Sequence, residues 1–182
     1  SIRSVGRWPW DREWHATLIQ ALKDFGARAV ALDMIFSEPT QPQTDELLAK
    51  VIQNSKFVYL PVGYRTVQGV SATAPMRSLP VMTEAAAGEG HTHVTPDRDG
   101  VVRKIHPFLE ESTGRRWHLA MLLALESWRL KPDQLQVERS RIRVPIPGNA
   151  ALQIPLDADG RLMMSWPARW KESFQRVSYA DA

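Results

Sequence analysis

Two helical patterns, each followed by a short apolar run, constrain the fold of this chain more than any other feature of its sequence. The first pattern predicts a helix with a buried stripe made of Trp14, Leu18, Ile19, Leu22 and Phe25. Gly26 is its predicted end, and the run "RAVALDMIF" follows at 28–36. A continuous apolar run of this length predicts a strand that is covered on both faces, as in parallel α/β sheets.

The same unit then repeats along the chain. Thr44 is the predicted N-cap of a second helix that ends near Asn54, and "KFVYLPVG" at 56–63 is the predicted second strand. Alternation of helix and strand at this pitch predicts a right-handed parallel arrangement.

The second half of the chain has a different pattern. A short helix is predicted at 79–88, ended by Gly88, and residues 91–108 predict two strands around an Asp-Gly turn. A further helix is predicted at 117–130, followed by short strands joined by Gly-containing turns at 142–166.

These elements together predict an α/β fold. We expect a mixed, mainly parallel sheet flanked by helices, with antiparallel hairpin additions in the second half. With 182 residues, of which 43% are hydrophobic, the chain is large enough for one sizeable core, so we expect a single domain over 1–182.

Charge and cysteine content narrow the function classes. The formal net charge is only +3, and the basic residues are spread along the chain, so we expect no nucleic-acid partner. Arg139, Arg141 and Arg143 alternate on a possible strand, which is typical of a solvated strand face. The chain has no Cys, which excludes disulfides. It contains no apolar run near the ~20 residues of a membrane-spanning helix.

Two similar segments, "TPDRDGVVRKI" and "PLDADGRLMMS", carry Asp-x-Asp-Gly before strand-forming residues. A calcium loop of the EF-hand type would need more ligands before its Gly and a Glu at its end. Neither copy has that Glu, so both segments are predicted to be tight turns.

His91 and His93 form the most suggestive group for metal chemistry. On a strand both imidazoles point to one face, with Asp97 and Asp99 close in sequence. A third ligand would have to come from Asp33 or Asp11, and no full ligand set is visible in the sequence. The alternative is a polar strand edge that lines a cleft.

Asp33 stands inside an apolar run, where a carboxylate needs a partner. At the carboxyl end of a parallel strand it would face the crevice where α/β folds bind ligands, with Arg7 and Arg65 as conceivable partners. The other interpretation is that Asp33 anchors the aromatic entry segment through Arg7 or the Trp10 indole. Both interpretations remain open at this stage.

No motif of nucleophilic or nucleotide chemistry is present. The chain lacks Cys, a Gly-x-Ser-x-Gly turn, a Gly-x-Gly-x-x-Gly loop and a Walker-type loop.

The whole chain resembles the second CHASE-type extracellular sensory domain family of bacterial membrane-bound signalling proteins. The matching stretches are "GRWPWDREWHATLIQAL", "GARAVALDMIFSEP", "HTHVTPDRDGVVRKIHPF", "IPLDADGRLMMSW" and "FQRVSYADA". Members of this family usually carry Pro where this chain has Asp11, and commonly Asn where it has His93. The second departure argues against a metal site shared by the family at His91 and His93.

The resemblance implies an extracytoplasmic (periplasmic) sensor domain, and we expect the chain to be a fragment of a longer membrane protein. Its expected partners are an unknown small-molecule or ion stimulus, attached membrane helices and a cytoplasmic output domain, namely a cyclase, diguanylate cyclase or kinase. A homodimer is a further possible assembly. Both chain ends are expected on the side of the fold that faces the bilayer.

This interpretation assigns no catalytic residue, metal or cofactor to the chain itself. The candidate ligand-binding residues are Arg7, Asp33, Ser37, His91 and His93. The alternative function is a metal-dependent hydrolase that uses His91, His93 and Asp33.

Overall fold

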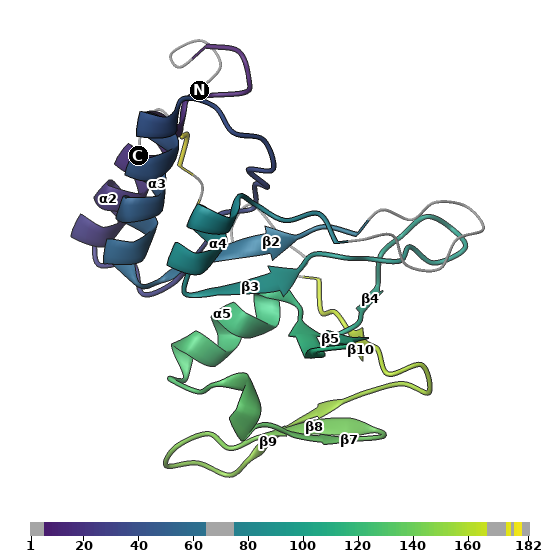
Figure 1. Ribbon diagram of the computed structural model, residues 1–182. Helices are drawn as coiled ribbons and strands as arrows, with labels where there is room; N and C mark the ends of the chain where they lie inside the picture. Colours follow the sequence, from purple (N-terminus) through teal and green to yellow (C-terminus); the bar gives the residue numbers. More distant parts are fainter. Residues whose placement is uncertain (1–5, 65–74, 167–173, 176, 180–182) are drawn as a thin grey trace.

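A parallel sheet covered by helices forms the first half of the molecule, which is represented by a computed structural model (Figure 1). The structure describes residues 6–64, 75–166, 174–175 and 177–179. The strands β1 (Val30–Ala31), β2 (Val58–Val62) and β3 (Gly88–His91) lie side by side in that order, and both pairs are parallel. This arrangement confirms the predicted α/β class and its parallel sheet.

Three helices pack on one face of this sheet, and a fourth covers the other face. The first three are α2 (Arg12–Asp24), α3 (Pro42–Ser55) and α4 (Pro80–Ala85), and the fourth is α5 (Leu119–Ser127), beneath the sheet in Figure 1. The core on the side of α2 and α3 includes Ile19, Leu48, Ile52, Leu60 and Met82, all 0% exposed. The sheet is therefore the middle of three layers.

Local chemistry explains where α2 and α3 begin and end. Asp11 is the N-cap of α2, because its carboxylate accepts a hydrogen bond from the Glu13 N–H at 3.0 Å. Helix α3 begins at Pro42, whose missing N–H costs nothing in a first turn, and ends before Lys56 in a left-handed conformation. The prediction of Thr44 as N-cap was wrong, since Thr44 lies inside the helix and its hydroxyl donates to the Gln41 carbonyl.

The predicted buried stripe of α2 had the wrong phase. Trp14 and Phe25 are 47% and 82% exposed, whereas Ile19 is buried as predicted. The buried face carries Arg12 and His15 with Ala16 and Ile19. A pattern that counts only apolar side chains cannot detect a face whose first turn is buried through an arginine and a histidine.

Two predicted boundaries also differ from the structure. Only Val30–Ala31 of the apolar run at 28–36 forms a strand, because the Met34 N–H bonds to the Leu32 carbonyl and turns the chain out of the ladder. Gly88 begins β3 and does not end α4.

The second half adds three small antiparallel sheets around α5. They are formed by β5 (Phe108–Glu111) with β6 (Gly114–Trp117), by β7 (Gln136–Glu138), β8 (Arg141–Val144) and β9 (Leu152–Pro155), and by β4 (Lys104–Ile105) with β10 (Leu162–Met163). A short helix, η1 (Pro132–Gln134), precedes β7. A second core of Trp117, Met121, Leu125, Leu130, Leu135, Ile142 and Val144 joins α5 to these strands.

The two Asp-Gly turns form as predicted, but the first one does not join a hairpin of paired strands. Gly100 and Gly160 have φ angles of +81° and +73°, which suit glycine. His91 belongs to β3 and pairs with β2, whereas β4 pairs with β10, so the predicted pairing within 91–108 was wrong. Arg141 and Arg143 do form a solvated strand face, since both side chains are 43% exposed, whereas Arg139 lies in the turn before β8.

The two halves meet most closely at Gly90 in β3. A β-carbon at this position would lie 2.6 Å from Leu119 Cα and 2.7 Å from Leu119 N. Both atoms belong to the backbone that begins α5, so they cannot move aside as a side chain would. The contact between β3 and α5 therefore requires glycine.

We predict that Gly90→Ala lowers the free energy of unfolding by about 2 kcal/mol or more, because overpacking against backbone forces the elements apart. Gly88→Ala is the matched control in the same strand, where a β-carbon would meet side chains and no backbone, with Tyr59 at 3.1 Å and Leu122 at 4.0 Å. Urea unfolding of both variants measures the difference. Equal costs would mean that the β3–α5 contact is loose.

Candidate functional site

Aromatic side chains from both ends of the described chain meet on the buried face of α2. We call this group, Trp8, Trp10, His15 and Tyr179, the terminal junction. The Trp10 and Tyr179 ring centroids lie 4.7 Å apart, and the His15 ring lies 5.7 Å from the Tyr179 ring. His15 Nδ1 and the Tyr179 hydroxyl form a hydrogen bond of 2.5 Å. The segment at 177–179 therefore lies directly beside the start of α2 (Figure 1).

A buried ion pair fixes α2 next to the terminal junction. Arg12 Nε lies 3.0 Å from Asp45 Oδ1, and these side chains are 10% and 8% exposed. A second guanidinium nitrogen donates to the Glu38 carbonyl at 3.0 Å, and the guanidinium stacks 4.4 Å from the centre of the Phe36 ring. Arg12 therefore links α2, α3 and the loop after β1 at one point.

Thr40 completes the environment of Asp45. Its N–H and hydroxyl donate to the Asp45 carboxylate at 2.8 Å and 3.0 Å. Burial alone would raise the pKa of Asp45, but the hydrogen bonds from Thr40 and Arg12 outweigh it and hold the pKa below its usual value. Asp45 thus stays ionised beside Arg12.

A hollow of about 500 Å³ lies between the terminal junction and the loop after β1. Its lining comes from two stretches, residues 8–12 and 34–40, and includes the predicted residue Ser37. Arg12 lines the same hollow. The carboxyl end of β1 therefore does open onto a cavity, as expected for a parallel strand.

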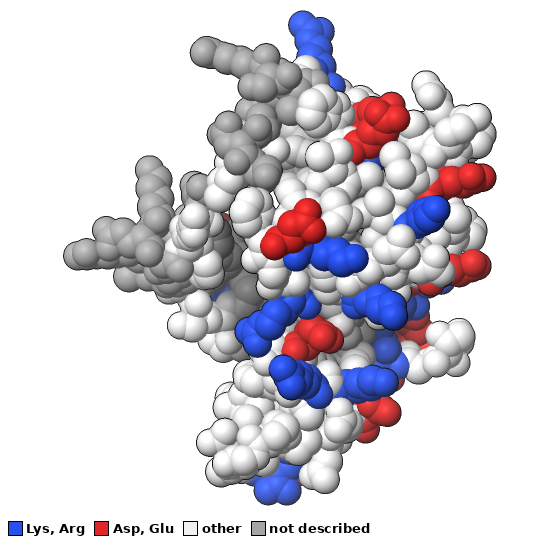
Figure 2. All heavy atoms as spheres, turned by 90° about the vertical axis from the view of Figure 1, so that its left-hand side faces the viewer, with Lys and Arg blue, Asp and Glu red and all other residues white. Residues whose placement is uncertain are grey.

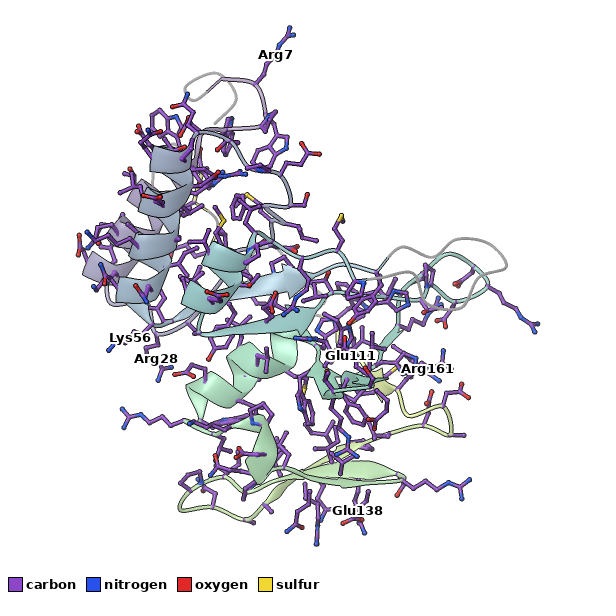
Figure 3. The ribbon with its side chains drawn as sticks, in the orientation of Figure 1. Arg7, Arg28, Lys56, Glu111, Glu138 and Arg161 are labelled. Carbon is purple, nitrogen blue, oxygen red and sulfur yellow. The ribbon has the colours of Figure 1, made fainter. Side chains whose placement is uncertain are left out.

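The structure does not bring Asp33 and Arg7 into this hollow. Both side chains are exposed, and Arg7 points away from the molecule in Figure 3. Asp33 has no ion pair or hydrogen bond within the described residues, and the Trp10 indole donates instead to the Gly6 carbonyl at 3.0 Å. Arg65, the other suggested partner, lies outside the described residues. The buried anchoring carboxylate is Asp45, which was not among the residues predicted from the sequence.

A second polar group follows the carboxyl ends of β2 and β3. The Tyr64 hydroxyl donates to Glu111, which also pairs with Arg116 at 3.0 Å. Burial, then the hydrogen bond to Glu111, raises the pKa of Tyr64 to about 12. Arg77 pairs with Glu89 in the same region. Every charge in this group has an opposite charge as its partner.

His91 and His118 lie at the end of β3 with ring centroids 4.9 Å apart. His91 Nδ1 accepts a hydrogen bond from the His93 N–H at 3.3 Å, and His118 Nδ1 accepts one from the Ala120 N–H at 3.1 Å. An imidazole that accepts at Nδ1 carries its proton on Nε2. Both Nε2 atoms are buried and have no partner among the described residues, and because they carry the proton neither offers a lone pair to a metal in this arrangement.

His93 lies beside His91 but differs from it. Its ring is 6.4 Å from the Tyr64 ring, and its side chain is only half-buried. Among the described residues, no group of three or more histidine or acidic side chains is placed to hold a metal ion. Asp33 has no contact with either histidine, so the geometry does not support the hydrolase hypothesis.

The groups missed from the sequence share one property. They are polar or charged side chains covered only through tertiary contacts: Arg12, His15 and Asp45 are buried, and Tyr64 and Tyr179 are half-buried. The available signal was the i, i+3 spacing of Arg12 and His15 ahead of Ala16 and Ile19, which places all four on one helical face.

We predict that Asp45→Asn lowers the free energy of unfolding by about 3 kcal/mol, because it leaves the buried Arg12 without its counter-charge. Asp33→Asn is the matched control and should stay within about 0.5 kcal/mol, as expected for an exposed side chain. Chemical denaturation of both variants measures the effect. An equal, small cost at the two positions would contradict the anchoring role of Asp45.

We predict that stability falls as the pH is lowered from about 6.5 to 4. Burial, then the neighbouring Arg12, lowers the pKa of His15 to about 4, and burial, then His118, lowers the pKa of His91 to about 3. The unfolded state binds more protons than the folded state in this range. The stability that each neutral, buried histidine contributes is therefore complete above its unfolded pKa and is lost as the pH falls toward its folded pKa. For His15 the loss amounts to about 3 kcal/mol.

The measurement is a series of urea unfolding curves between pH 4 and 7. His15→Gln should reduce the slope of stability against pH in this window, whatever its effect on the baseline. Part of the remaining slope should come from His91, and part from His106 and His118, whose pKa values burial also lowers. A slope that is unchanged in His15→Gln would show that His15 titrates alike in both states.

Comparison with known proteins bears on the whole chain. The family model described as CHASE2 domain matches residues 1–182. No curated protein and no solved structure matches the sequence. Within the described residues, no helix is long and apolar enough to span a bilayer. The chain belongs to the CHASE2 family of extracellular sensory domains from signalling proteins.

Proposed function

We propose that this chain is the extracytoplasmic sensory domain of a transmembrane signalling protein. In this proposal membrane helices connect its two ends to a cytoplasmic output domain, which is a cyclase, diguanylate cyclase or kinase. The observation that carries it is the direct contact of the two terminal segments, with Trp10 and Tyr179 rings 4.7 Å apart. Two membrane helices that leave the domain from one point require such a geometry.

The terminal junction is also suited to transmit a change. Tyr179 is held to α2 by ring contacts and one hydrogen bond to His15, whereas Arg12 on the same helix holds the loop that lines the adjacent hollow. A stimulus that binds better to one arrangement of this loop and helix shifts the population of that arrangement. Small displacements of packed elements between two discrete arrangements then move the attached helices.

The extracytoplasmic location is tested by labelling a single introduced cysteine in the full-length protein. Val101 is 45% exposed, and this 182-residue chain contains no Cys, so Val101→Cys adds one defined site to it. We expect a membrane-impermeant maleimide to label it in intact spheroplasts to the same extent as after lysis. The parent protein serves as the control, because it measures the labelling of cysteines outside this domain. Labelling of Val101→Cys that appears only after lysis would place the domain in the cytoplasm.

Coupling through the terminal junction is tested by Tyr179→Phe in the full-length protein. The variant keeps the ring but removes the hydroxyl that bonds to His15. We expect the output activity in membranes to change by about fivefold or more, the lower range of coupling energies between sites. Tyr64→Phe, which removes a hydroxyl bonded to Glu111, is the control and should leave the output near the parent level. Equal outputs in both variants would contradict coupling at the junction.

A second copy of the chain as a signalling partner stays a prediction.

A further inference from the structure

A cavity of about 710 Å³ lies where the two halves of the molecule meet, at the end of the sheet where β2 and β3 begin. Its lining comes from the end of α3, from the turn between α4 and β3, from β6 and from α5 with the segment that follows it. Its volume lies within the range of about 300–1,000 Å³ typical of small-molecule sites. None of the candidate ligand-binding residues predicted from the sequence lines this cavity.

One wall of the cavity is apolar. It is formed by Trp117, Leu122, Leu125 and Leu130, which belong to or pack against the core around α5. Ala85 and Ala86 lie on the side of α4. This wall suits the hydrocarbon part of a ligand, because binding would remove apolar surface from water on both partners.

The two carboxylates that line the cavity already have partners. The Tyr59 hydroxyl donates to Glu126 Oε2 at 2.8 Å, and Glu89 pairs with Arg77. Burial, then this hydrogen bond to Glu126, raises the pKa of Tyr59 to about 12, so the hydroxyl stays protonated. Within the described residues neither carboxylate forms an ion pair with a cation of the rim, although Glu126 keeps its negative charge because its partner is a neutral hydroxyl.

Those basic residues are Lys56, Arg115 and Lys131. Arg115 pairs with Glu110 at 3.0 Å, whereas Lys56 and Lys131 have no acidic partner within the described residues. Arg28 lies beside Lys56 in Figure 3. Figure 2 shows basic side chains over the middle of this face of the molecule, with acidic side chains among them and at their edge. With Arg115 and Glu89 paired elsewhere, Lys56 and Lys131 outnumber Glu126, so the lining carries a net positive charge.

The backbone conformation gives an independent indication that this cavity is a functional site. Lys56 and Arg129 are the non-glycine residues with positive φ in the part of the chain that the structure describes, at 62° and 57°. Lys56 lines the cavity, and Arg129 directly precedes the lining residue Leu130. Glycine is the usual residue where a helix ends in this conformation, and unfavourable backbone geometry often accompanies functional positions.

We propose that this cavity binds a small organic anion with an apolar body. The apolar body lies against Trp117, Leu122 and Leu125, and the anionic group lies at Lys56 and Lys131. The role of this ligand as the stimulus rests on the proposed sensory function, whereas the binding itself does not.

Binding at this position would act on both halves at once. Lys56 follows α3 and precedes β2 in the first half, whereas Trp117, Leu125 and Lys131 belong to the second half. A ligand that contacts both sides favours one relative placement of the two cores. Helix α3 also carries Asp45, so the same element links this cavity to the ion pair beside the terminal junction.

The test uses anilinonaphthalene sulfonate, a fluorescent probe with an apolar aromatic body and one sulfonate, titrated onto the 182-residue chain. Phenylnaphthylamine has the same rings without the charge, and inorganic sulfate has the charge without the rings. We expect the sulfonate probe to bind with one-to-one stoichiometry and more tightly than either comparison compound. Equal binding of phenylnaphthylamine, or displacement of the probe by equimolar sulfate, would overturn the proposed ligand class.

Two variants locate the site. Lys56→Gly removes a cation where the positive φ favours glycine, and Lys131→Gln removes an exposed one, so the double variant is expected to fold as stably as the parent. We expect its affinity for the probe to fall about tenfold, the loss of one or two charge-assisted contacts. The control Lys50→Gln removes an exposed cation of α3 outside the cavity and should keep the parent affinity.

Parent affinity in a double variant with an unchanged thermal melt would overturn the site. That failure is distinct from failure of the proposed function. Val101→Cys labelling and the Tyr179→Phe output of the full-length protein do not depend on what this cavity binds.

Discussion

The buried ion pair between Arg12 and Asp45 is the interaction on which the first half of this molecule depends. Two charges removed from water are stable only when each one is fully satisfied, and here Thr40, Glu38 and the Phe36 ring supply the remaining contacts. The pair thereby sets the phase of α2 on the sheet. It turns His15 inward, toward Tyr179, and leaves Trp14 facing solvent.

A second constraint joins the two halves at the opposite side of the sheet. Gly90 allows β3 to approach the backbone of α5 more closely than any side chain would permit. The second core can then form against the face of the sheet that α5 covers, with Trp117 and Leu125 at the boundary between the two halves. The cavity beside this contact is bordered by both halves, so its shape depends on how they are placed.

Histidine has a structural role here that its spacing in the sequence did not suggest. His15 and His91 are fully buried, and burial holds both in the neutral form at physiological pH. The alternation of His91 and His93 resembled part of a ligand set. The structure places His91 against His118, with Nδ1 of each ring bonded to a backbone N–H. Hydrogen bonds to the backbone occupy Nδ1 of each ring and leave the proton on Nε2. Sequence spacing cannot reveal these bonds.

The sequence by itself determined the helices, the parallel pairing of the first two strands and the two Asp-Gly turns, because these depend on local periodicity and on backbone preferences. It also carried the family resemblance across the whole chain. Only the tertiary structure decided which carboxylate is buried, because Arg12, 33 positions before Asp45, reaches Asp45 and does not pair with Asp33. The same holds for the contact of Trp10 with Tyr179 and for the cavity at Lys56 and Lys131, which join residues that no local pattern connects.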